Sequence, residues 1–158
     1  EKEVYFHIIG GVAHSEMHGS IHAPGFQELI QKYGIEKQVI FHGQRFGDEL
    51  DRLFNQADFA IGSLARHRSE ITYIKTLKNR EYAARGIPFI YSEIDEDFEQ
   101  MPYIIKAKAD ESPINIDEII QFITDHQFNA GRIRNSIAHL TWSEQMKKVL
   151  DNATRTYE

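Results

Sequence analysis

Basic side chains are concentrated in the segment 66–85, and this concentration suits the binding of an anion. The segment has a net charge of +4, whereas the whole chain has a formal net charge of −6; its charged residues are Arg66, Arg68, Lys75, Lys78, Arg80 and Arg85 against Glu70 and Glu81. We expect it to follow an apolar strand and to begin a helix, where free backbone N–H groups favour negative charge. A diphosphate is therefore the expected ligand, and a solvated, charged helix face is the alternative interpretation.

Lys78 and Glu81 are three residues apart, so they share one face of the expected helix. As a plain surface ion pair they would contribute only ~0.3–0.5 kcal/mol. They could instead hold a ligand, with the lysine on a phosphate and the carboxylate on the two hydroxyls of a ribose. The two residues are thus candidate ligands for a nucleotide.

The elements that must position these side chains follow from the order of apolar segments. Expected strands are 4–9, 39–41, 58–64, 89–91 and 103–107, and expected helices are 26–33, 48–57, 69–85, 117–126 and 129–158, with a break near 140–141. Such alternation indicates an α/β fold, a Rossmann-like parallel sheet with helices on both faces. We expect one domain over 1–158, with C-terminal helices at about 129–158.

Composition excludes several classes of protein. The 158 residues contain no cysteine, which excludes disulfides and thiolate chemistry. No apolar run reaches the ~20 residues that span a bilayer, so no transmembrane segment is expected. The beginning of the chain lacks the layout of a signal peptide. Because the net charge is negative, nucleic acid is not an expected partner. A cytoplasmic globular protein is the expectation.

Ligands of open α/β sheets bind outside the carboxyl ends of the strands. Those ends are expected at Gly10-Gly11, at 42–45, at 63–69 and at 92–93. Gly10-Gly11 lacks the GxGxxG spacing, so the sequence predicts no dinucleotide site there. His42 ends a strand at this edge and is a candidate for ligand contact.

Several motifs, taken in order, resemble those of the group 1 (family 4-like) glycosyltransferases of the GT-B fold. The run KNREYAARGIPFI at 78–90 resembles the family's K-x-x-E-Y-x-A-x-G-x-P-h-h signature. Four further runs are similar to other family motifs: HIIGG at 7–11, VIFHG at 39–43, DELDRLFNQADFAI at 48–61 and LTW at 140–142. The resemblance covers almost the whole chain.

The resemblance implies two Rossmann-like domains that face each other across a cleft. This chain looks like the C-terminal, donor-binding half without its first strand-helix unit, and the N-terminal acceptor-binding domain is absent from it. The implied reaction moves a sugar from a nucleoside diphosphate sugar to a glycan or lipid-linked acceptor, as in polysaccharide biosynthesis. We expect no bound metal or other cofactor and little activity from this part alone. The full-length protein would contact the cytoplasmic face of a membrane peripherally.

Residue by residue, the resemblance assigns Glu81 to the donor ribose and Lys78 to the phosphates. Lys78, with Arg66 or Arg68, is the expected catalytic group, because the departing diphosphate needs cations. The remaining donor-binding residues are Gly10, Gly11, His42, Gly43, Gln44, Arg45 and Ser63.

One departure from the family concerns a second glutamate, which many members carry eight residues before the first. Tyr73 stands there in this chain, and Glu70 is out of register. Arg66, His67 and Arg68 are the candidates to take over phosphate and sugar contacts. The departure also leaves an alternative open, a non-catalytic Rossmann-like module that binds an anion or a partner protein.

The histidines and the remaining polar runs favour structural interpretations. His14, His18 and His22 have a spacing of four that suits a metal, but Gly19, Pro24 and Gly25 favour a polar surface loop. We expect His7 in the core and Trp142 as a packing anchor of the last helix. The run Glu93–Asp97 is typical of a solvated acidic turn, from which Glu93 could reach a sugar hydroxyl.

Overall fold

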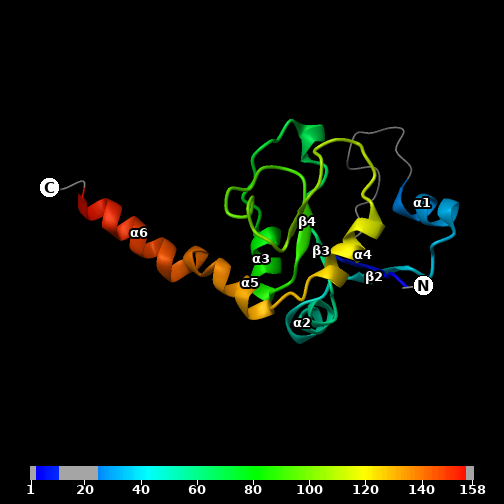
Figure 1. Ribbon diagram of the computed structural model, residues 1–158, viewed down its shortest axis with the longest axis horizontal. Helices are drawn as coiled ribbons and strands as arrows, with labels where there is room; N and C mark the ends of the chain where they lie inside the picture. The colour runs from blue at the N-terminus through cyan, green and yellow to red at the C-terminus, as the bar shows by residue number, and fades with distance from the viewer. Residues whose placement is uncertain (1–2, 11–24, 156–158) are drawn as a thin grey trace. The chain divides into compact units, whose positions relative to one another are not determined.

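The computed structural model describes residues 3–10 and 25–155, which form parallel strands flanked by helices (Figure 1). The chain divides into two compact units, Glu1–Leu53 and Phe54–Glu158. The expected α/β class with parallel strands is confirmed. The strands form a two-stranded and a three-stranded sheet, whereas the sequence predicted one sheet.

The first unit is built on a pair of parallel strands. Its elements are β1 (Phe6–Ile9), α1 (Phe26–Tyr33), β2 (Val39–Gly43) and most of α2 (Gly47–Asn55). Gly34 ends α1 in the left-handed conformation, with φ 64°, as its C-cap position requires. The prediction of a buried first strand is wrong, because Phe6 is 42% exposed and no residue of β1 is buried.

The second unit contains a three-stranded parallel sheet in the order β3-β4-β5. Its elements are β3 (Ala60–Ile61), the 3₁₀ turn η2 (Arg66–Ser69), α3 (Leu77–Arg85), β4 (Phe89–Tyr91), β5 (Ile104–Lys106), α4 (Ile116–Asp125), α5 (Ala130–Ser136), the 3₁₀ turn η3 (Ala138–Leu140) and α6 (Trp142–Arg155). The turn η3 confirms the break expected near 140–141.

The helix expected over 69–85 forms only in its second half. Residues 71–76 are not helical, and Tyr73 forms a parallel bridge with Ile94. This stretch is rich in β-branched side chains, which favour extended backbone. Thr76 then begins α3 as its N-cap, because its side chain accepts a hydrogen bond from the Asn79 N–H at 3.5 Å.

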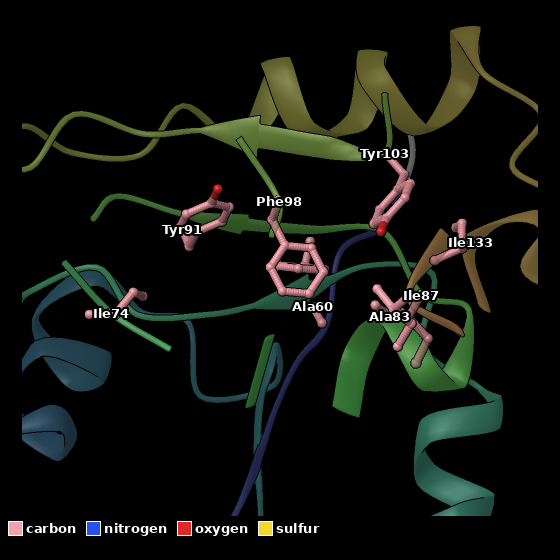
Figure 2. Packing of buried hydrophobic residues seen from close by; sticks show 10 residues of the cluster. Ala60, Ile74, Ala83, Ile87, Tyr91, Phe98, Tyr103 and Ile133 are labelled. Carbon is pink, nitrogen blue, oxygen red and sulfur yellow. The ribbon is translucent and has the colours of Figure 1, made fainter. Parts of the chain in front are cut away.

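The core of the second unit is centred on Phe89 of β4. Its ring lies 5.3 Å from that of Phe98 and 5.7 Å from that of Tyr82, measured between centroids. Ala83 of α3 and Ile87, two residues after the end of α3, lie near Ile133 of α5 on the same side of the cluster (Figure 2). This aromatic cluster holds β4 in place, and β4 in turn sets the position of the residues after it.

Helices α3 and α5 lie side by side (Figure 1). Gly86 ends α3 with φ 78°, and a Cβ at this position would lie 2.6 Å from the Cβ of Ala130. Arg134 of α5 donates to the carbonyls of Ala84 and Arg85 at 3.2 and 3.0 Å, so it satisfies the last turn of α3. The contact fixes the direction of α3, whose other end bears Lys78.

The last helix differs from expectation in one residue. Trp142 is 83% exposed, so its prediction as a packing anchor is wrong. Three other apolar side chains of α6 are also exposed, namely Met146, Val149 and Leu150. Within the described ranges, no helix has both the length and the apolar character needed to cross a membrane.

Candidate functional site

Most of the basic side chains in the segment 66–85 are paired with carboxylates. The pairs are Arg68 with Glu111, Lys75 with Glu96, Arg80 with Asp95 and Asp97, and Arg85 with Glu81. Arg66 and Lys78 are the basic residues of this segment whose side chains make no hydrogen bond or ion pair with any other described residue. The charge excess predicted from the sequence is therefore reduced, in the fold, to two unpaired cations.

Arg66 lies at the start of η2, which follows the carboxyl end of β3 after residues 62–65. Its backbone N–H donates to Glu93 Oε1 at 2.8 Å, which ties η2 to the residues that follow β4. Glu70 ends the turn with φ 56°, the left-handed conformation of a C-cap. The Arg66 guanidinium is left exposed at the edge of the sheet where α/β proteins bind ligands.

His67 and Arg68 both contact Glu111, a residue of the segment between β5 and α4. Glu111 Oε1 lies 2.9 Å from His67 Nε2 and accepts from Arg68 Nε at 2.7 Å, and its second oxygen accepts from Arg68 Nη2. Hydrogen bonds from Arg68 and then His67 lower the pKa of Glu111 to about 2. Arg68 is thus neutralised by a carboxylate of the chain itself.

Lys78 lies in the first turn of α3, two residues after the N-cap Thr76, and is exposed. Glu81, one turn later, accepts from Arg85 Nε and Nη2, both at 3.2 Å. The structure therefore keeps Lys78 unpaired on the helix but engages Glu81 with a neighbour. The Glu81 side chain is still 46% exposed and can meet a ligand.

Three buried side-chain atoms in the described part of the chain lack a hydrogen-bond partner, and they gather near the carboxyl ends of β3 and β4. They are His67 Nδ1, Asn79 Oδ1 and Glu93 Oε2. Glu93 is 2% exposed and Asn79 is fully buried. Buried polar atoms are almost always paired, so three unpaired ones at one end of a sheet mark it as a place for water or a ligand.

Gly62, directly after β3, has no room for a side chain. A Cβ there would lie 2.8 Å from Asn79 Oδ1 and 2.9 Å from the Ile90 carbonyl oxygen.

We predict that Gly62→Ala lowers the free energy of unfolding by about 1–3 kcal/mol, the range of overpacking. Urea denaturation measures this. Gly131→Ala is the control: its methyl would meet only the Asn129 side chain, at 3.1 Å, and an equal loss there would contradict the prediction.

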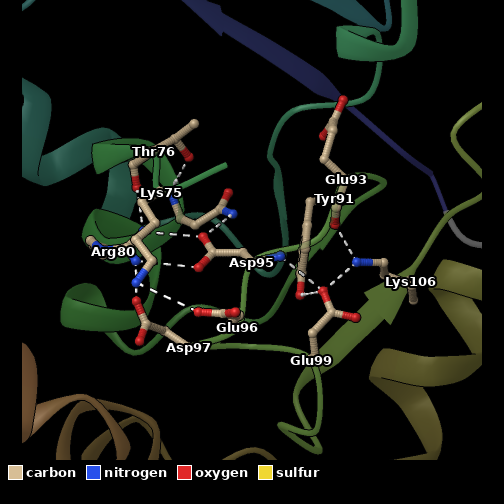
Figure 3. Close-up of polar contacts among 11 residues, drawn as sticks. Lys75, Thr76, Arg80, Tyr91, Glu93, Asp95, Glu96, Asp97, Glu99 and Lys106 are labelled. Atoms are coloured by element: carbon tan, nitrogen blue, oxygen red, sulfur yellow. Dashed lines mark hydrogen bonds and ion pairs between the residues drawn. The ribbon is translucent and has the colours of Figure 1, made fainter. Parts of the chain in front are cut away.

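The acidic run 93–97 is a structural network rather than the solvated turn predicted from the sequence. Asp95 is fully buried and accepts from Arg80 Nη1 and Nη2 at 3.1 and 3.2 Å and from Asn79 Nδ2 at 3.2 Å (Figure 3). Asp97 also pairs with Arg80. Tyr91, Ser92, Glu93 and Asp95 are all buried, and the acidic composition of the run gave no sign of this burial.

Glu99 completes this network on the side of β5. Its Oε1 accepts from Tyr91 OH and from the Asp95 N–H, both at 2.9 Å, and Lys106 Nζ also contacts it (Figure 3). Burial opposes ionisation of Glu99, but the hydrogen bonds from Lys106, the Asp95 backbone and Tyr91 outweigh it and lower its pKa. These groups are committed to the connection between β4 and β5.

Tyr73, which stands where the family has a glutamate, is 69% exposed. With Ile74 and Ile94 it lines a hollow of about 280 Å³, at whose edge Lys75 and Glu96 form an ion pair at 3.8 Å. Binding pockets for small molecules usually start at ~300 Å³, so this hollow fits no more than part of a ligand.

The predicted residues of the first unit form their own group at the carboxyl ends of β1 and β2. The Gly10 N–H donates to the Gly43 carbonyl at 2.8 Å. His42 Nε2 lies 2.8 Å from His7 Nδ1, with the rings stacked, and burial, followed by the charges of His7 and Arg45, lowers the pKa of His42. His7 is exposed, so its prediction as a core residue is wrong.

Two further predicted residues, Arg45 and Ser63, make contacts within the chain, and Arg45 forms an ion pair with Glu49 at 3.7 Å. Arg45 donates to its neighbour's carbonyl, Gln44 O, at 2.9 Å. Ser63 uses its carbonyl to join the ends of β3 and β4, because it accepts from the Ser92 N–H at 3.0 Å. Gly11 lies outside the described residues.

The polar surface loop predicted at His14, His18 and His22 lies outside the described residues, since all three histidines fall in 11–24. Across residues 3–10 and 25–155, no three His, Asp or Glu side chains gather in a way that could hold a metal ion.

No known protein family matches the sequence, and no curated protein matches it. The resemblance to the glycosyltransferases therefore rests on the motifs quoted above.

Proposed function

We propose that this chain is the donor-binding part of a glycosyltransferase that transfers a sugar from a nucleoside diphosphate sugar to a glycan or lipid-linked acceptor. The observation that supports it most is the pair of cations, Arg66 and Lys78, that have no partner among the described residues and lie at the carboxyl end of the second unit's sheet. In this position basic side chains and helix N–H groups favour a diphosphate. The ordered motifs from 78 to 90 support the same function.

In the proposed site, Arg66 and Lys78 bind the diphosphate and stabilise the charge that develops on it as it leaves. Arg68 joins them once its contact with Glu111 opens. Glu81 accepts from the ribose hydroxyls with the oxygen capacity that Arg85 does not use. The cations replace a metal in this reaction, and we propose a cytoplasmic protein that meets the membrane only through the full-length chain.

The alternative function, an anion-binding module without transferase activity, has one observation in its favour. Glu81, the residue expected to bind ribose, is already engaged by Arg85. Such a module would bind inorganic pyrophosphate as well as it binds a nucleoside diphosphate. A nucleotide site would prefer the nucleoside diphosphate, because base and ribose add contacts.

Lys78→Ala tests the proposal directly. We expect this change to weaken nucleoside diphosphate binding about tenfold, the effect of losing one charge-assisted hydrogen bond. Calorimetric titration with UDP, GDP and ADP measures the affinities. Lys148→Ala removes an exposed lysine of α6 and serves as the matched control. Equal affinities of the two variants would contradict a role for Lys78 in the site.

A further inference from the structure

Glu111 binds two side chains of η2, those of His67 and Arg68, that follow Arg66 in the proposed anion site. It bridges the Arg68 guanidinium with both carboxylate oxygens and also contacts His67 Nε2 at 2.9 Å. Arginine uses this two-pronged geometry for carboxylates and for phosphates alike. In the fold, the chain's own carboxylate therefore lies where two oxygens of a phosphate would fit.

We propose that Glu111 is a built-in competitor at this site, which an incoming phosphate or diphosphate must displace from His67 and Arg68. The ligand class rests on the proposed function. The inference adds the residue that regulates how tightly η2 holds the ligand.

The pair between Arg68 and Glu111 has the character of an exchangeable contact. The two side chains are 61% and 64% exposed, and exposed ion pairs are weak enough to exchange partners. Glu111 lies in residues 107–115, between the end of β5 and the start of α4, so its release need not disturb either element.

Arg80 shows what a structural arginine looks like in the same unit. Its side chain is 19% exposed, and it lies against Asp95, which is fully buried. Displacing that carboxylate would break a buried network, whereas displacing Glu111 only opens a surface contact.

Titration with inorganic pyrophosphate tests whether Glu111 competes with a ligand for His67 and Arg68. We expect Glu111→Gln to bind pyrophosphate about two- to fivefold more tightly than the unmodified chain, the change that loss of an exposed ion pair allows. Asp110→Asn is the matched control. It removes the same charge one residue away, from a side chain that accepts from the Ser112 N–H at 2.8 Å and makes no hydrogen bond or ion pair with Arg68. The pyrophosphate affinity of this variant should therefore stay near that of the unmodified chain.

The Arg68 Nε–H resonance gives a readout at the site itself. In Glu111→Gln it should shift with pyrophosphate, and adding Arg68→Met should remove the gain in affinity. Equal affinities of Glu111→Gln and Asp110→Asn would overturn the proposal, because only overall charge would then matter. Weaker binding by Glu111→Gln would also overturn it, since Glu111 would then orient Arg68 for the ligand.

The same titration separates this inference from the proposed function. If Glu111→Gln gains affinity for pyrophosphate but no nucleoside diphosphate binds better than pyrophosphate, the proposed role of Glu111 is supported and the donor-binding function is contradicted. If a nucleoside diphosphate is preferred but Glu111→Gln gains no affinity for pyrophosphate, the donor-binding function is supported and the proposed role of Glu111 is contradicted. Lack of pyrophosphate binding by both proteins overturns the competitor.

Discussion

Arg80→Met is expected to lower the free energy of unfolding of the second unit by about 3–5 kcal/mol, the cost of leaving a buried charge unpaired. Asp95 is fully buried and loses two hydrogen bonds to the guanidinium, and Asp97 loses its ion pair. The methionine keeps much of the aliphatic volume, so the loss reports mainly on the charge. Urea denaturation followed by circular dichroism measures the change.

Two further variants test whether the loss of stability comes from the buried charge of Asp95. Arg68→Met breaks the exposed pair with Glu111 and should unfold close to the unmodified protein, because surface pairs contribute little. Asp95→Asn in the Arg80→Met background removes the buried negative charge and should recover part of the lost stability. A loss below about 1 kcal/mol for Arg80→Met would show that water, not Arg80, satisfies Asp95.

Gly86→Ala should lower the free energy of unfolding by about 2–5 kcal/mol through two independent effects. The first is the left-handed backbone, with φ 78°, which penalises any side chain. The second is the close approach of α5, because the new methyl would lie 2.6 Å from the Ala130 Cβ and 2.7 Å from its Cα and carbonyl oxygen. None of these atoms is the end of a flexible side chain, so one of the two helices must move.

Gly34→Ala isolates the first effect. Gly34 also ends a helix in the left-handed conformation, with φ 64°, but a Cβ there would meet nothing within 4 Å. Its expected loss is about 1–2 kcal/mol, the cost of the backbone alone. Amide resonances of α3 and of α1, followed through urea denaturation, report on each change. Equal losses in the two variants would contradict the close packing of α3 on α5.

Elements with strong local signals were predicted closely from the sequence. Helix 26–33 and strand 89–91 have the predicted bounds, because Gly34 and the run Gly86-Ile87-Pro88 mark a helix end and a strand start. The helix expected from 69 failed at 71–76, where a bridge between Tyr73 and Ile94 holds the chain. The β-branched side chains of 71–76 favour extended backbone locally, but the partner of Tyr73 in the bridge is distant in sequence, so no local pattern encodes the pairing.

The candidate site was likewise predictable only where local sequence signals define it. The order of the elements predicts its place at the carboxyl end of a parallel sheet. The charge excess indicated six basic residues, and only the structure distinguishes Arg66 and Lys78 among them. The partners that neutralise the other cations did not follow from the sequence, because Arg68 and Glu111 are 43 residues apart. The prediction for Trp142 was wrong because the residue type suggested burial, whereas the side chain is exposed in the fold.

The central claim, that the second unit binds a nucleoside diphosphate at the carboxyl ends of β3 and β4, is tested most directly by a two-dimensional amide NMR titration. The titrants are UDP, GDP, ADP and CMP, because the method detects the millimolar affinities expected of a partial site. We predict saturable shifts with one diphosphate, centred on residues 63–68 and 77–81, that are lost in a Lys78→Ala, Glu81→Ala variant. Shifts that are absent with all four nucleotides, or that persist unchanged in the variant, would contradict the claim.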